Sequence, residues 1–89
     1  MTKKELNRIV ASGLRRSCRF LAVEIRTDGN PSQEVIVNPT GSVEGALAYY
    51  NAEYDDNLEM ICAKYQGKRI WIADAMMTNR LHDLEELFS

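Results

Sequence analysis

The stretch FLAVEIRTDGNPSQEVIVN, residues 20–38, contains two apolar runs separated by turn-forming residues. Its first residues alternate in polarity, which places Leu21, Val23 and Ile25 on one face of a strand. The segment TDGNPS then gathers turn formers, because an Asp-Gly pair tolerates a positive φ angle and proline donates no backbone hydrogen bond. EVIVN follows as a second apolar run. The sequence therefore predicts an antiparallel hairpin over residues 19–38.

Helical patterns flank this hairpin on both sides. Thr2 followed by Glu5 is typical of a capping box, and it starts an amphipathic helix over residues 3–16. Either Thr40 or Ser42 caps a second, long helix. The expected range of that helix is residues 43–65, ending before Gly67.

The remaining segments predict a third strand and a last helix. KRIWIADA places Ile70 and Ile72 on one strand face, with Trp71 and Ala73 on the other. The tail NRLHDLEELFS has helical spacing. Its apolar positions are Leu81, Leu84, Leu87 and Phe88.

These elements predict a two-layer α+β domain with the order α-β-β-α-β-α. A three-stranded sheet, formed by the hairpin plus the third strand, packs against the long helix, with shorter helices at both ends. The first strand is the most apolar and is therefore expected at the centre. The crossover from the second strand to the third should leave those two strands parallel.

Length and composition indicate a single domain over residues 1–89. The hydrophobic fraction of 45% and the charged fraction of 27% are those of an ordinary globular protein. Cys18 and Cys62 match no metal or redox spacing, so we expect reduced thiols. The charged N-terminus has no apolar run that could enter a membrane, and the expected location is cytoplasmic.

The net charge of −2 is unevenly distributed. Residues 1–19 carry six bases against one acid, and the rest of the chain carries five bases against twelve acids. A basic segment of this kind can bind nucleic acid. It can also lie against the acidic part of its own chain, which is the interpretation we favour here because the six bases are not densely spaced.

The predicted long helix has two different faces. One is a core-facing stripe, which makes most of its tyrosines structural. Its members are Val43, Leu47, Tyr50, Tyr54, Leu58, Ile61 and Tyr65. The opposite face carries Tyr49, Glu53, Asp56 and Met60, and Lys64 is the one base of the helix. This acidic face suits a basic partner surface, although a purely solubilising role remains an alternative.

Catalytic and metal-binding patterns are missing from the sequence. The single histidine, His82, has the character of a surface residue, and no Cys/His cluster has zinc spacing. No glycine-rich phosphate loop and no nucleophile elbow are present. We therefore expect a protein that is not an enzyme and has neither a metal nor a cofactor.

Nucleic-acid binding is the alternative function. Phosphate contacts would come from bases of the N-terminal segment, and Phe20 and Trp71 offer aromatic rings for stacking. The candidate phosphate ligands are Lys4, Arg8, Arg15, Arg16 and Arg19. An overall pI near 5.3 opposes long-range attraction to nucleic acid, which makes this function the second choice.

The segments FLAVEIRTDGNPSQEVIVNP and YYNAEYDDNLE together resemble small phage- and prophage-encoded proteins of Gram-positive bacteria, mostly without an assigned function. The plan of a hairpin followed by an acidic helix is also similar to that of some anti-CRISPR inhibitors. That resemblance implies that acids such as Glu53, Asp55, Asp56 and Glu59 imitate phosphates.

The sequence as a whole predicts a non-catalytic protein–protein interaction module, encoded by a phage or mobile element. Its partner would be a protein with a basic surface, and no membrane is involved. A homodimer that pairs the basic helix of one chain with the acidic helix of another stays open.

Overall fold

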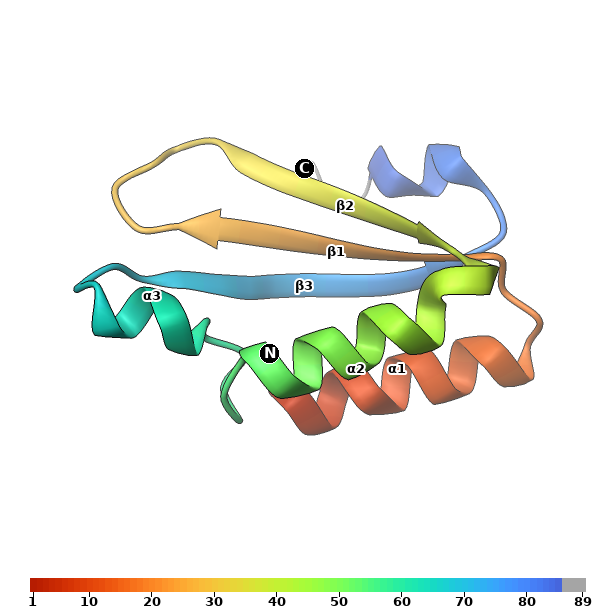
Figure 1. The fold of residues 1–89 in the computed structure, drawn as a ribbon. Helices are drawn as coiled ribbons and strands as arrows, with labels where there is room; N and C mark the ends of the chain where they lie inside the picture. The colour runs from red at the N-terminus through yellow and green to blue at the C-terminus, as the bar shows by residue number, and fades with distance from the viewer. Residues whose placement is uncertain (86–89) are drawn as a thin grey trace.

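The computed structural model describes residues 1–85, apart from the side chain of Thr40. The chain forms an α+β domain in which helices pack against a three-stranded antiparallel sheet (Figure 1). The elements are α1 (Lys3–Arg15), β1 (Phe20–Thr27), β2 (Gln33–Pro39), the 3₁₀ helix η1 (Thr40–Ser42), α2 (Val43–Glu53), α3 (Ile61–Tyr65), β3 (Ile70–Thr78) and the 3₁₀ helix η2 (Leu81–Leu84).

The sheet has the strand order β2-β1-β3, which confirms that the first strand is central. β1 pairs antiparallel with both neighbours, so β2 and β3 run in the same direction, as expected for a crossover over the sheet. Val23 of β1 pairs with Ile36 of β2 and with Ala75 of β3. The predicted hairpin is confirmed.

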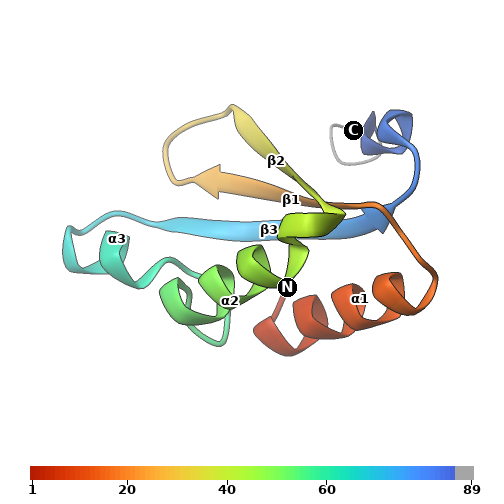
Figure 2. The ribbon, with the colours of Figure 1, turned by 45° about the vertical axis from the view of Figure 1, so that its right-hand side comes forward.

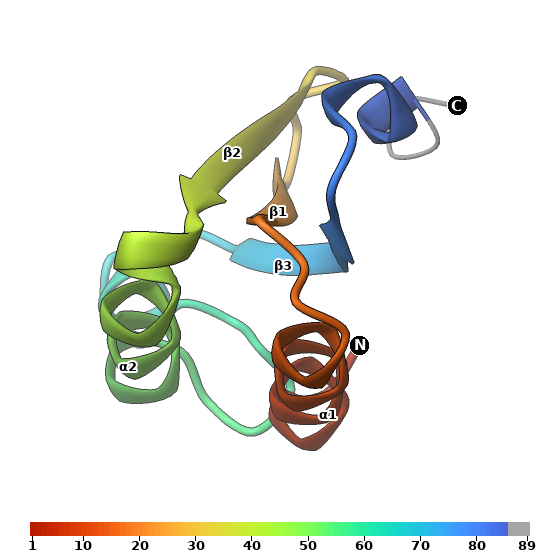
Figure 3. The same ribbon diagram turned by 90° about the vertical axis from the view of Figure 1, so that its right-hand side faces the viewer.

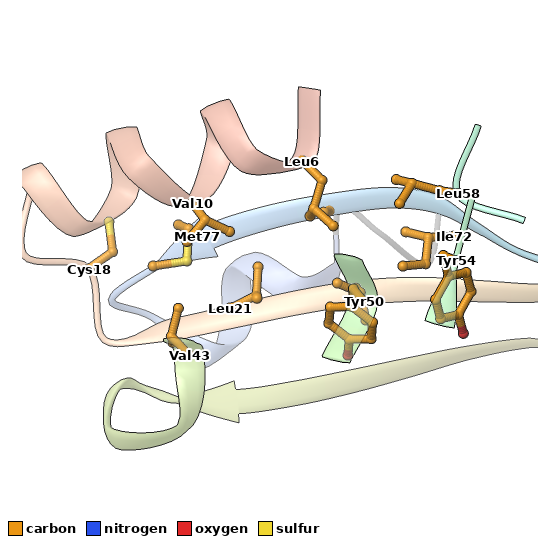
Figure 4. Close-up of a cluster of buried hydrophobic side chains, with 12 residues drawn as sticks. Leu6, Val10, Cys18, Leu21, Val43, Tyr50, Tyr54, Leu58, Ile72 and Met77 are labelled. Atoms are coloured by element: carbon orange, nitrogen blue, oxygen red, sulfur yellow. The ribbon is translucent and has the colours of Figure 1, made fainter. Parts of the chain in front are cut away.

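One face of this sheet carries the core. α1 and α2 lie side by side beneath it, while η2 lies on the other side of the sheet (Figures 2 and 3). Figure 4 shows how side chains from both helices meet those of β1 and β3. The largest fully buried side chains are Tyr54, Leu6, Leu21, Leu58, Ile72, Val10, Val23 and Val43. Cys18 is buried at the edge of this cluster, whereas Cys62 is exposed.

α1 begins as the sequence predicts, because the Thr2 hydroxyl accepts a hydrogen bond from the backbone N–H of Glu5 at 3.2 Å. Near its C-terminal end the helix approaches β3 closely at Gly13. A Cβ atom at Gly13 would lie 2.3 Å from the Cβ of Met77, so a larger residue cannot fit without a shift of the helix or the strand.

The predicted helix over residues 43–65 is wrong in its middle. α2 ends at Glu53, and Tyr54 adopts an extended conformation. The chain then makes a tight turn in which Leu58 has a φ of +57°. Two β-bridges replace the missing helical turns, one between Tyr54 and Met60 and one between Glu59 and Trp71. Pairing with β3 therefore takes the place of continued helix.

This turn changes the predicted core stripe. Its members up to Leu58 are buried or half-buried, as expected, but Ile61 is 37% exposed and Tyr65 is 88% exposed. The reason is that α3 starts afresh after the turn with a different orientation. Ala63 is the residue that α3 buries instead.

The C-terminal part differs as well. β3 is longer than the predicted strand and extends to Thr78. The described part of the predicted last helix is η2, a short 3₁₀ helix that includes Leu84. The predicted packing of Leu87 and Phe88 lies outside the described residues.

Gly13→Ala tests the close packing of α1 on β3. Alanine gains roughly 1 kcal/mol of helix propensity over glycine, but the contact with Met77 costs about 1–3 kcal/mol through overpacking. We expect a net loss of stability in urea unfolding followed by circular dichroism. Gly45→Ala in α2 is the matched control, since nothing lies within 4 Å of its added Cβ, and it should be stabilising. A stabilised Gly13→Ala variant would contradict the packing described.

Candidate functional site

A groove of about 440 Å³ opens between the C-terminal part of α2 and the hairpin end of the sheet. We call it the tyrosine groove. Its lining combines apolar side chains with three phenols and one carboxylate. The lining residues are Ile25, Thr27, Glu34, Ile36, Tyr49, Tyr50, Tyr54, Met60 and Ile70.

Strand pairing builds the floor of the groove. Glu34 pairs with Ile25 across β1 and β2, and Thr27 pairs with Ile70 across β1 and β3. Side chains of directly paired residues share a face, and alternation brings Ile36 onto the same face as Glu34. The helical face of the sheet therefore continues past the core into the groove, with the exposed carboxylate of Glu34 at its β2 edge.

Three tyrosines form one side of the groove. The Tyr49 and Tyr50 ring centroids are 5.7 Å apart, those of Tyr50 and Tyr54 are 5.9 Å apart, and both pairs meet edge to face. Tyr50 and Tyr54 are buried, and their hydroxyls point toward β2 (Figure 4). The side-chain amide of Asn38 donates a hydrogen bond to the Tyr50 hydroxyl at 3.4 Å. Tyr49 is 52% exposed and is the part of this row that solvent reaches.

The surroundings of these hydroxyls disfavour negative charge. Burial, followed by the nearby hydroxyls of Tyr49 and Tyr50 and the carboxylate of Glu34, raises the pKa of Tyr54 to about 12. Burial also raises the pKa of Tyr50, against the hydrogen bond from Asn38. None of the described residues that line the groove is a lysine, arginine or histidine. The groove is therefore apolar with an electronegative rim.

The turn after α2 places Tyr54 and Met60 at the groove. One carboxylate oxygen of Asp55 accepts hydrogen bonds from the backbone N–H groups of Asn57, at 2.9 Å, and Glu59, at 3.0 Å. The other oxygen forms an ion pair with Lys64. Burial alone would raise the pKa of Asp55, but these hydrogen bonds and Lys64 hold it below its usual value.

Backbone bonds then attach the turn to β3. The N–H of Met60 donates to the carbonyl of Ile70 at 2.8 Å, and the N–H of Ile72 donates to the carbonyl of Leu58 at 2.9 Å. These bonds hold the Met60 side chain against the core cluster on the groove side. The wall of the groove is thus fixed by sheet-like pairing rather than by a helix.

The predicted partner-binding residues do not lie on one helical stripe, because the helix ends at Glu53. Tyr49 and Met60 both line the groove. Glu53 lies one helical turn after Tyr49 at the end of α2. Asp56 lies in the turn beside the start of α1, where its carbonyl accepts a hydrogen bond from the N–H of Lys3 at 2.9 Å.

Two acids of the predicted acidic helix are neutralised by bases of the chain. Asp55 is paired with Lys64, and Glu59 is paired with Arg69 at 2.6 Å. Within residues 1–85, neither Glu53 nor Asp56 forms an ion pair. The acidity available to a partner is therefore smaller than the sequence suggested.

The strand side of the groove was missed from the sequence. Glu34 is the residue with the clearest signal, because it occupies an inward position on a strand whose next inward residue is the apolar Ile36. This position places the Glu34 carboxylate beside apolar side chains at the groove, although Glu34 itself is exposed. Since the hairpin register and the position of α2 are both needed to find this groove, the sequence pattern alone could not locate it.

The basic residues of α1 remain on the surface. Lys4, Arg8 and Arg15, with Arg16 just after the helix, are exposed and form no ion pair within the described chain. Arg19 is also exposed, and its backbone N–H donates to the Asn79 side chain.

Hydrogen bonds to amide and carbonyl oxygens, rather than to carboxylates, join α1 to α2. The side-chain amides of Asn7 and Asn51 bond to each other at 3.0 and 3.1 Å, and the Lys3 ammonium donates to the Asn51 carbonyl at 2.9 Å. The basic segment therefore lies beside α2, as the favoured interpretation expects, but within residues 1–85 no ion pair joins the bases of α1 to the acids of α2.

No group of three or more His, Cys, Asp or Glu side chains within residues 1–85 is placed to hold a metal ion. No helix of that same range is both long and apolar enough to cross a membrane. No known protein family matches this chain, and neither a curated protein nor a solved structure is significantly similar to it.

Tyr54 should make folding sensitive to alkaline pH. The pKa of Tyr54 is raised in the folded state from its ordinary value near 10 to about 12. The neutral hydroxyl therefore contributes fully to the free energy of unfolding below about pH 10, and this contribution is lost as the pH rises toward about 12. We expect the wild type to lose more unfolding free energy than Tyr54→Phe between about pH 9 and about pH 11.5. Equal losses in the two proteins would show that the Tyr54 hydroxyl is not buried beside Glu34.

Proposed function

We propose that this protein is a non-catalytic interaction module that binds a basic surface of a partner protein through the tyrosine groove. The observation that carries the proposal is the groove itself. It is preformed, it is lined by apolar and tyrosine side chains, and it has a carboxylate but no described base in its lining. The proposal includes no catalytic step and no cofactor.

The chemistry of the groove is that of protein interfaces. Tyrosine and methionine are enriched in interface cores, and anchor residues concentrate in well-packed pockets. Tyr49 offers a half-exposed ring beside Met60, while Glu34 is exposed at the β2 side and Glu53 at the end of α2. A partner with positive charge around an inserted side chain complements this arrangement.

The structure alters the idea of phosphate imitation that came from the anti-CRISPR resemblance. Lys64 and Arg69 already neutralise Asp55 and Glu59, so an extended row of free acids is not available. A mechanism based on the groove requires only Glu34 in its lining and Glu53 at the end of α2. Encoding by a phage or mobile element stays a prediction and contributes nothing to this geometry.

Tyr49→Ala tests the groove as the partner surface. We expect a partner protein that is captured from nuclease-treated bacterial lysate by the wild type to be lost on Tyr49→Ala. With the purified partner, affinity should fall at least about ten-fold, or 1.4 kcal/mol. Tyr65→Ala is the matched control, because Tyr65 is 88% exposed on α3 and does not line the groove.

Charge reversal at Glu53, measured as binding affinity with the same purified partner, separates the contribution of charge from that of shape. Glu53→Lys should weaken binding further as salt is lowered, because charge repulsion is least screened there. Glu44→Lys at the start of α2 controls for net charge. A partner that binds wild type and Tyr49→Ala equally would show that the groove is not the functional surface.

Nucleic-acid binding through α1 remains a second candidate, because its exposed bases are unpaired within the described chain. Arg8, Arg15 and Arg16 also surround a shallow hollow of about 390 Å³. Phe20 and Trp71 lie half-buried on the opposite face of the sheet from α1, so stacking and phosphate contacts would not share one surface.

This second candidate predicts a measurable salt dependence. Arg8→Ala, Arg15→Ala and Arg16→Ala should each weaken binding to a fluorescent single-stranded oligonucleotide. Each should also reduce the slope of log affinity against log salt by about 0.7 for every phosphate that the variant no longer neutralises. Lys68→Ala is the control, since Lys68 is an exposed base away from α1. Absence of binding at low salt, or slopes unchanged by all three substitutions, would eliminate this candidate.

A further inference from the structure

We propose that the tyrosine groove is a socket for a single arginine side chain in a basic segment of the partner. This inference rests on the proposed function, because it names the group that the groove would accept. It follows from three features of the protein: an aliphatic floor, an electronegative rim, and an arginine site elsewhere in the chain built from the same kinds of group.

The floor suits the stem of the arginine. Ile25, Ile36, Met60 and Ile70 supply aliphatic and thioether surface along the groove. Arginine buries its methylene groups on such surface while its charged end stays near water. A volume of about 440 Å³ is ample for one long side chain. The groove is open to solvent on the side of the half-exposed Tyr49.

The rim suits the guanidinium. Glu34 is exposed, lines the groove and forms no ion pair within residues 1–85. The ring of Tyr49 is half-exposed, so an incoming cation can reach it. The faces of aromatic rings attract cations. The planar guanidinium can stack on a ring while it donates two hydrogen bonds to a carboxylate, which an ammonium cannot do.

The chain already binds one arginine with the same two kinds of group. Arg69 lies with its guanidinium carbon 4.2 Å from the Trp71 ring centroid and pairs with Glu59 at 2.6 Å. The groove repeats an aromatic ring and a carboxylate, Tyr49 and Glu34, but none of the chain's described bases lines it. A partner is therefore the source of the cation.

The test is an NMR titration of the full chain, labelled with ¹⁵N, using a blocked pentapeptide that has arginine at its centre and alanine elsewhere. Peptides with citrulline or norleucine at the same position are the comparison. We expect saturable shift changes at the amides of Glu34, Tyr49 and Met60 with the arginine peptide, and at least ten-fold weaker binding of the other two. Citrulline keeps the shape and loses the charge, so it isolates the cationic contribution.

Two variants complete the design. Glu34→Gln keeps the shape of the rim and should weaken arginine-peptide binding at least three-fold, while Tyr65→Ala should leave it unchanged. The socket is refuted if the arginine peptide gives no saturable shifts or if the citrulline peptide binds equally well. In that case, loss of a protein partner on Tyr49→Ala would still support the proposed function. If the arginine peptide binds as expected but no partner depends on Tyr49, the socket stands and the proposed function falls.

Discussion

Asp55 directs the turn after α2 that places Leu58 in the core and Met60 at the groove. Its carboxylate binds the backbone N–H groups of Asn57 and Glu59, which offers the chain an alternative to helical hydrogen bonds. Each hydrogen bond to this charged carboxylate contributes about 1.5–3 kcal/mol. The turn also inserts Leu58 into the core, where burial of a leucine contributes about 1.5–3 kcal/mol. Together these gains offset the unusual positive φ at Leu58.

The groove is a consequence of this turn. With the helix interrupted, Met60 pairs with the start of β3 and closes a space that the tyrosines of α2 and the hairpin already border. In a continuous helix, Met60 would lie about 16.5 Å along the axis from Tyr49, since it follows Tyr49 by eleven positions with a rise of about 1.5 Å each. Both side chains line one groove only because the chain folds back between them.

The sequence predicted the sheet well, because hairpin formation rests on local signals. Neighbouring residues carry all of these signals: the alternation and apolar character of β1, and the turn residues before β2. The turn after α2 was missed because its neighbours follow a helical apolar period. Asp55, Asp56 and Asn57 are poor helix formers, which was the available signal, but the decisive pairing of Leu58 and Met60 with β3 involves residues distant in sequence.

The candidate site was only partly predictable for the same reason. The sequence predicts Tyr49 and Met60 as site residues on one helical stripe, but the helix ends between them at Glu53. The strand pattern does not identify Glu34, because it does not show which element packs beside that strand. The sequence also does not show which acids are neutralised, because the ion pair of Asp55 with Lys64 forms only when the chain turns after α2. Local patterns identify the residue types, and the fold decides which of them meet.

The turn at Asp55 brings Met60 to the tyrosines of the groove. The most direct measurement is a nuclear Overhauser spectrum of the protein with ¹³C-labelled methionine methyl groups, combined with backbone chemical shifts. We expect contacts from the Met60 methyl to tyrosine rings of the groove and to Ile70, with helical shifts that stop at Glu53. Helical shifts that continue through residues 54–60, without contacts between Met60 and the tyrosines or Ile70, would contradict it.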